Sequence, residues 1–172
     1  VDMVNEKLIS KKQAVLRIDP KSLDTLLHPT LDEKSSINVI ANGLPASPGA
    51  ASGKVVFSSE EAERLNAMMQ DTILVRVETS PEDIQGMHAA KGILTARGGM
   101  TSHAAVVARG MGRPCVSGSS DIDINYENKS FKTSSIEIRE GDIITIDGST
   151  GRIIDGSVST VEPEISGNFS KL

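Results

Sequence analysis

GGMTSHAAVVARG, residues 98–110, is the stretch around which the rest of the chain is organised. Gly98 and Gly99, which have no side chains, open a turn. Thr101 and Ser102 each offer a hydroxyl oxygen that could cap a following helix. The run after His103 is small, apolar and partly β-branched. The stretch therefore predicts a loop that enters a packed helix, with a histidine at the junction.

His103 stands where the predicted loop becomes the predicted helix. The start of a helix carries partial positive charge and free N–H groups, which favour anions such as phosphate. A neutral imidazole beside it, approached across Gly98 and Gly99, can accept a phosphoryl group as a nucleophile. The alternative is that His103 only helps to cap the helix. The glycine pair, the paired hydroxyls and the small-residue helix together favour the functional interpretation.

Length, charge and cysteine content exclude several classes of protein. The 172 residues fit one ordinary domain with an extension, and the formal net charge of −5 makes nucleic acid an unexpected partner. No apolar run approaches the roughly 20 residues of a membrane-spanning helix. The start of the chain has no signal-peptide pattern, and the single Cys115 suits a reducing compartment. We therefore expect a cytoplasmic location, or an organelle for a whole enzyme.

Apolar runs alternate with helical patterns between residues 54 and 117. Strands are expected over 54–57, 72–77, 92–96 and 114–117, and helices over 58–70, from Ser80 and from Thr101 or Ser102. We expect Met69 on the buried face of the 58–70 helix. From residue 118 onward, turn residues and short apolar runs predict hairpins or a small sandwich. Alternating strands and helices are typical of a layered α/β domain, with functional loops at strand ends.

The flanking segments have a different character. Residues 1–40 predict a connector of short helices, one beginning at Ser10 and one carrying the leucines of 23–27. Such short amphipathic helices cannot bury their own apolar faces, so we expect them to lie on another domain. Residues 42–53 are rich in Gly, Pro and small residues, which indicates a surface loop, or a loop that lets the domain move or lies beside His103.

The extended signature GGMTSHAAVVARGMG, residues 98–112, closely resembles the phosphohistidine signature of the phosphoenolpyruvate-utilising enzymes. The resemblance extends over nearly all of the chain. It is strongest to the dikinase branch, since phosphoenolpyruvate synthase and enzyme I usually carry Arg at the position of Met100. The resemblance implies a swivelling β/β/α phosphohistidine domain over residues 41–160, with the connector over 1–40 and an exit linker over 161–172.

The same resemblance implies a phosphoryl carrier. His103 would accept the β-phosphoryl group of ATP at an ATP-grasp nucleotide domain. It would deliver that group to pyruvate at a separate barrel, and the products would be phosphoenolpyruvate, AMP and pyrophosphate. Mg²⁺ and a monovalent cation would bind at these partner domains of a homodimeric enzyme. The fragment itself would hold no metal and would not turn over alone. The alternatives are the carrier domain of the synthase or of enzyme I, and a non-catalytic module of the same fold.

Several side chains near His103 are candidates for supporting roles. The residues expected beside the phosphate are Gly98, Gly99, Thr101 and Ser102. Arg97 and Arg109 are candidates for phosphate contact, with a surface salt bridge as the alternative for each. The resemblance also implies that Thr101 is a site of regulatory phosphorylation by a kinase and its opposing phosphatase.

Other groups that could carry chemistry are interpreted as structural. His28 and His88 have no neighbours at metal-ligand spacing, and Cys115 is expected to be a small buried hydrophobe in a strand. A hydrolase triad of His103 with Ser119 and Asp121 has little support from the sequence.

Overall fold

The computed structural model describes residues 1–20, 23, 27–32 and 36–163. In this part of the chain, eight strands form a main sheet in the order β2-β12-β11-β4-β5-β6-β7-β3. Strands β4 to β7 are parallel to one another, and the remaining pairs are antiparallel. The strands are β2 (Val39–Asn42), β3 (Leu44–Ser47), β4 (Ala50–Val56), β5 (Thr72–Arg76), β6 (Gly92–Thr95), β7 (Cys115–Ser117), β11 (Ile143–Asp147) and β12 (Arg152–Asp155).

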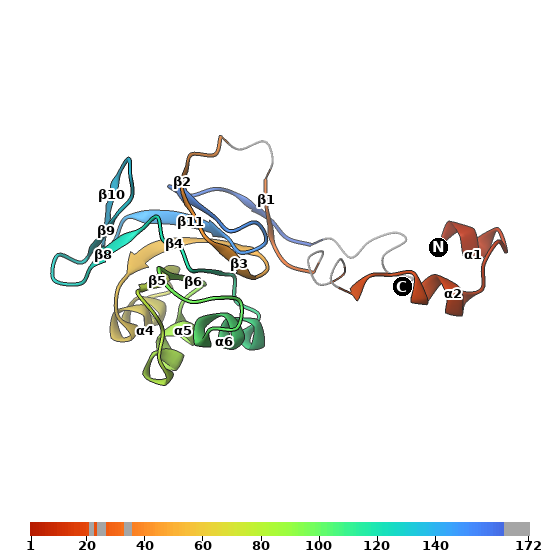
Figure 1. Cartoon of the computed structure of the whole chain (residues 1–172), viewed down its shortest axis with the longest axis horizontal. Coiled ribbons are helices and arrows are strands. Elements are labelled where there is room, and N and C mark those ends of the chain that lie inside the picture. Colours follow the sequence, from red (N-terminus) through yellow and green to blue (C-terminus); the bar gives the residue numbers. More distant parts are fainter. Residues whose placement is uncertain (21–22, 24–26, 33–35, 164–172) are drawn as a thin grey trace.

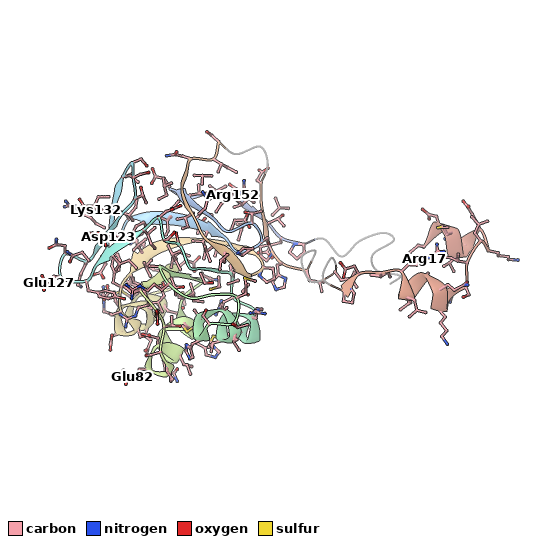
Figure 2. All side chains as sticks on the ribbon, in the orientation of Figure 1. Arg17, Glu82, Asp123, Glu127, Lys132 and Arg152 are labelled. Carbon is pink, nitrogen blue, oxygen red and sulfur yellow. The ribbon has the colours of Figure 1, made fainter. Side chains whose placement is uncertain are left out.

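A second, small sheet and a layer of helices cover the two faces of the main sheet (Figure 1). The small sheet consists of β8 (Asp123–Asn125), β9 (Ser130–Lys132) and β10 (Glu137–Arg139). The helix layer consists of α4 (Ser59–Ala67), the 3-10 helix η1 (Pro81–Asp83), α5 (Ile84–Ala89) and α6 (His103–Met111). Asp123, Glu127 and Lys132 project outward from the small sheet and its turn (Figure 2). The predicted β/β/α layering is confirmed.

Side chains along the parallel strands point alternately to the two faces of the main sheet, so a hydrophobic core forms on each face. Ile73 and Val75 of β5 face the small sheet, whereas Leu74 between them faces the helices. All three side chains are fully buried, and each such side chain contributes roughly 1.5–3 kcal/mol of hydrophobic stabilisation. A strand with both faces covered needs a continuous apolar run, which is why residues 72–77 predicted a strand correctly.

Residues 42–53 are not a surface loop, and both loop interpretations of this stretch are wrong. The stretch contains β3 and the first part of β4, which pair with β7 and β11. Its small residues allow close packing: a Cβ on Gly53 would lie 2.8 Å from the backbone of Thr72. The glycine and alanine content therefore reflects tight contact between strands rather than a flexible segment.

Helix α4 ends at Ala67, short of the predicted Gln70. Met69 adopts a left-handed conformation (φ 58°) and is 96% exposed, so its predicted place in the core is wrong. The N–H of Gln70 donates to the carbonyl of Leu65, and the N–H of Met69 donates to that of Asn66. This is the hydrogen-bond pattern that closes a helix and reverses the chain, here toward β5.

The N-terminal helices α1 (Asp2–Asn5) and α2 (Lys11–Leu16) lie apart from the three layers (Figure 1). Ser10 caps α2 as predicted, through the backbone N–H of Gln13. Neither helix buries a residue, and Leu16 is 77% exposed. The predicted helix around residues 23–27 falls largely outside the described residues.

The segments through which the chain enters and leaves the three layers (the body) lie side by side in a short pair of strands. Strand β1 (Thr30–Leu31) pairs antiparallel with β13 (Thr160–Val161). The N–H of Asp32 also donates to the carbonyl of Ser159 (2.9 Å). The chain therefore enters and leaves the body at the same place.

Candidate functional site

The site lies at the carboxyl end of β6, where the chain turns into α6. Ser102 is the N-cap of α6, and its Oγ accepts a hydrogen bond from the N–H of Ala105 (3.3 Å). Gly112, with φ 65°, ends the helix. The predicted helix start is confirmed, with Ser102 rather than Thr101 as the cap. Ala104, Ala105 and Ala108 are buried, and their small side chains let α6 pack closely against the sheet.

Two glycines shape the loop before the histidine. Gly98 has φ 109°, and a Cβ at this position would lie 2.8 Å from the Cβ of Ser102. Gly118, with φ 61°, follows β7, and its Cβ would lie 2.5 Å from the carbonyl oxygen of Gly98. Only glycine fits both positions without displacing the loop. By contrast, a Cβ on Gly99 would meet no atom within 4 Å, so the approach to the loop is open there.

His103 is half-buried at the first position of α6. Its Nδ1 lies 2.9 Å from the hydroxyl oxygen of Thr79, which belongs to the loop between β5 and η1. When Nδ1 carries the proton and donates to Thr79, the lone pair stands on Nε2. The contact orients the ring through Nδ1, and Nε2 has no hydrogen-bond partner among the described residues.

The start of α6 also offers backbone donors. In the described structure, the N–H groups of His103 and Ala104 have no hydrogen-bond acceptor. Such groups at a helix N-terminus carry partial positive charge and attract anions. An imidazole nitrogen beside free donors is a combination suited to holding a phosphoryl group.

The two arginines near His103 differ in what they contact. Arg109 bends back along α6, so that its guanidinium donates to the carbonyls of Ala105 and Met100. Arg109 therefore reaches the loop that precedes His103. The side chain of Arg97 is exposed, and among the described residues it makes neither an ion pair nor a side-chain hydrogen bond. A phosphate contact by either arginine stays a prediction.

Residues 68–151 match the family described as PEP-utilising enzyme, mobile domain. The matched region contains both Thr79 and His103. The chain belongs to the phosphoenolpyruvate-utilising enzymes. Its α/β layers and its histidine loop are thus those of a mobile domain.

Three curated relatives of this chain are named pyruvate, phosphate dikinase. Pyruvate, phosphate dikinase of Rhizobium meliloti (strain 1021) is 59% identical over 172 residues, which is 100% of this chain and 19% of the relative. The enzyme of that name from Clostridium symbiosum is 55% identical over 99% of the chain and 20% of the relative. The chloroplastic one from Flaveria trinervia is 54% identical over 98% of the chain and 18% of the relative. The chain thus spans about a fifth of the length of these relatives.

The remaining polar candidates of the mobile domain have structural surroundings. Ser119 is fully buried and donates to the carbonyl of Asn42, and Asp121 accepts from the N–H of the same residue. Both side chains therefore support β2 rather than a triad with His103. Cys115 is buried in β7 as predicted, and burial raises the pKa of its thiol to about 12.

Thr79 was not predicted as a site residue. The sequence gives no signal for it, because a threonine in a turn has no distinctive pattern and the contact with His103 spans 24 residues. Within the described residues, no three or more His, Cys, Asp or Glu side chains are grouped so that they could hold a metal ion. In the same part of the chain, no helix is both long and apolar enough to cross a membrane.

Proposed function

We propose that this chain is the phosphoryl-carrier domain of a pyruvate, phosphate dikinase. The single observation that carries the proposal is the pairing of His103 Nδ1 with Thr79 at a helix start; we propose that Nδ1 carries the proton in this pair, so that Nε2 is the nucleophile. The names of the relatives support the dikinase assignment. His103 would take the β-phosphoryl group of ATP at one partner domain and give it to pyruvate at another.

The transfer steps follow from ring chemistry. The lone pair of Nε2 attacks the β-phosphorus of ATP, a P–N bond forms, and the P–O bond to the leaving AMP breaks, so that the ring first carries a pyrophosphoryl group. Inorganic phosphate then attacks the γ-phosphorus, the P–O bond between the β- and γ-phosphates breaks, pyrophosphate leaves, and one phosphoryl group stays on Nε2. The ring then carries a positive charge, and the Nδ1 proton remains on its hydrogen bond to Thr79. In the second half-reaction the P–N bond breaks as the enolate oxygen of pyruvate takes the phosphoryl group. The ring returns to its neutral form.

Phosphate trapping on the full-length enzyme tests the assignment of His103. After incubation with ATP labelled at its β-phosphate, inorganic phosphate and Mg²⁺, we expect labelled phosphate on this domain that is labile in acid and stable in alkali. His103→Asn should abolish the label, whereas His88→Asn, which changes an exposed histidine of α5, should retain it. Label that survives in a folded His103→Asn enzyme would refute the proposal.

The products distinguish the dikinase from related carriers. We also propose, from the resemblance to the dikinases, that Mg²⁺ and a monovalent cation bind at the partner domains. A requirement for inorganic phosphate and release of pyrophosphate would support the dikinase. Formation of phosphoenolpyruvate without inorganic phosphate as a substrate would indicate the synthase instead. A domain that never becomes labelled would be a non-catalytic module.

We also propose that the domain moves between its two partners. One imidazole must reach two separate sites, and rotation of the domain on its connections is the simplest way to do so. Strands β2, β3 and β4 belong to the main sheet, and β1 pairs with β13, so the pivots are proposed before Thr30 and after Val161. An engineered disulfide that locks the domain onto one partner should preserve one half-reaction and stop the other. Two surviving half-reactions would rule out the movement.

A further inference from the structure

The loop that carries Thr79 is held at both ends by residues from outside it. At its start, the N–H of Val77 donates to the hydroxyl of Tyr126 (2.7 Å). At its end, the N–H of Ser80 donates to the carboxylate of Asp83 (2.9 Å). Thr79 lies between these two anchors, half-buried. The position of its hydroxyl therefore depends on both hydrogen bonds.

Tyr126 reaches this loop from the other side of the main sheet. It is the chain's only tyrosine and lies in the turn between β8 and β9, 49 residues after Val77. Figure 2 marks the neighbouring Glu127 at the outer tip of this turn, far from α1 and α2. Through this hydrogen bond, Tyr126 therefore connects the small sheet to the loop that contacts the histidine.

Arg76 connects the two anchors. Its guanidinium carbon lies 5.1 Å from the centroid of the Tyr126 ring, and its Nε lies 3.4 Å from the carboxylate of Asp83. Arg76 also donates to the carbonyl of Phe57 (3.0 Å), the residue that follows β4, and this hydrogen bond holds the guanidinium there. Asp83 is only 5% exposed and accepts a further hydrogen bond from Ser59. The start and the end of the Thr79 loop thus belong to one charged and aromatic network.

We infer that Tyr126 is a positioning residue for His103, acting through Val77 and Thr79. Its hydroxyl fixes the start of the loop, so that Thr79 presents its oxygen to Nδ1 and the lone pair of the neutral ring stays on Nε2. Loss of a group that orients a histidine through its second nitrogen lowers activity by roughly 10–100-fold in metal sites. The inference extends the proposed function of His103 and rests on it.

The test measures the histidine tautomer directly, without any transfer reaction. In the full chain labelled with ¹⁵N at its histidines, long-range ¹H–¹⁵N spectra report which ring nitrogen of His103 carries the proton. We expect mainly the Nδ1–H form in the unaltered chain. Tyr126→Phe retains the ring over Arg76 and removes only the hydroxyl. We expect it to lower the Nδ1–H fraction at least twofold, and Thr79→Val to lower it further.

Two controls make the outcome decisive. Thr133→Val removes a hydroxyl from the turn between β9 and β10 of the same small sheet, and it should leave the His103 spectrum unchanged. The His28 and His88 signals should stay constant in all variants. An unchanged tautomer in Tyr126→Phe overturns the inference, as does a shift of equal size in Thr133→Val. Because phosphate trapping is scored separately, failure of the inference leaves the test of His103 intact.

Discussion

The hydroxyl oxygen of Thr79 lies 2.9 Å from Nδ1 of His103, so one ring nitrogen is engaged inside the protein. In the proposed function, the other nitrogen receives the phosphoryl group at the start of α6. This arrangement couples the loop after β5 to the loop after β6, and these strands are parallel neighbours. Carboxyl ends of adjacent parallel strands meet at one edge of a sheet, which is where such domains place their ligands.

Replacing Thr79 should separate the hydrogen bond from the shape of the side chain. Thr79→Val keeps the volume but loses the hydroxyl, and we expect phosphoryl transfer in the full-length enzyme to slow by roughly 10–100-fold. Thr79→Ser keeps the hydroxyl and should retain most of the rate. Rapid-quench measurement of phosphate on His103 distinguishes the variants. Equal rates in Thr79→Val and the unaltered enzyme would contradict a role for the contact.

The family resemblance implies that Thr101 is a regulatory site, and an anion there would compete with the phosphoryl group for the start of α6. Its side chain is exposed, and phosphorylation would add about −1.5 to −2 charges. Thr101→Glu should therefore largely block labelling of His103 in the full-length enzyme, whereas Thr101→Val should keep at least part of the activity and lose regulation. Normal labelling of a Thr101→Glu enzyme would refute this mechanism.

A matched stability measurement separates Thr101 from its neighbour. Because Ser102 caps α6, Ser102→Ala should lower the free energy of unfolding by about 0.5–2 kcal/mol. In the described structure Thr101 makes no side-chain hydrogen bond, so Thr101→Val should change the free energy of unfolding much less. Urea unfolding of the full chain compares the two variants.

Substitution of alanine for Gly98 and for Gly110 should change the free energy of unfolding in opposite directions. Gly98→Ala introduces a Cβ at φ 109° and against Ser102, so we expect a loss of about 1–3 kcal/mol in unfolding free energy. Gly110→Ala places a methyl group where no atom lies within 4 Å, on a helix, and should gain about 0.5–1 kcal/mol. Urea unfolding measures both. A neutral Gly98→Ala would show that the loop tolerates a side chain.

The Cys115 thiol should react slowly in the folded chain. Its raised pKa should also lower the free energy of unfolding at alkaline pH. Burial raises the pKa of its thiol from 9.0 to about 12, although the charge of Arg109 acts in the opposite direction. Thiol reagents should therefore modify it slowly at pH 8 and rapidly in denaturant. Above about pH 9 the unfolded chain ionises this thiol while the folded chain does not. The free energy of unfolding should fall there, and less so in Cys115→Ala.

The isolated chain should not phosphorylate itself from ATP. Phosphoryl transfer requires metal ions and cationic groups around the travelling phosphate, and the described residues offer no cluster of metal ligands. Incubation of the purified chain with labelled ATP and Mg²⁺ should leave His103 unlabelled. Addition of the nucleotide domain as a separate protein should restore slow labelling. Rapid labelling of the chain alone would contradict the proposal that a separate nucleotide domain is needed for phosphoryl transfer to His103.

Local signals in the sequence located much of the fold. Apolar runs predicted β5 and β6, and capping serines predicted the starts of α2, α4 and α6. The glycine pair before Ser102 predicted the place of His103. These features depend on contacts within a few residues, which the sequence displays directly.

Features that depend on distant contacts could not be predicted in the same way. Strand β3 contains Pro45 and small residues, which favour a loop locally, and only pairing with β7 makes it a strand. The place of β11 and β12 in the main sheet likewise follows from their pairing with β4 and β2. Thr79 and Tyr126 belong to the site because the fold brings loops together, and neither has a sequence pattern of its own.

The pairing of β1 with β13 gives the body the architecture of an insertion module. Opposite Cα atoms in an antiparallel pair lie about 4.5–5.5 Å apart, so Thr30 and Val161 enter and leave almost as consecutive residues would. A segment built this way can be exchanged between host proteins without altering the spacing of what precedes and follows it. Circular permutation that joins these two strands should preserve the layers.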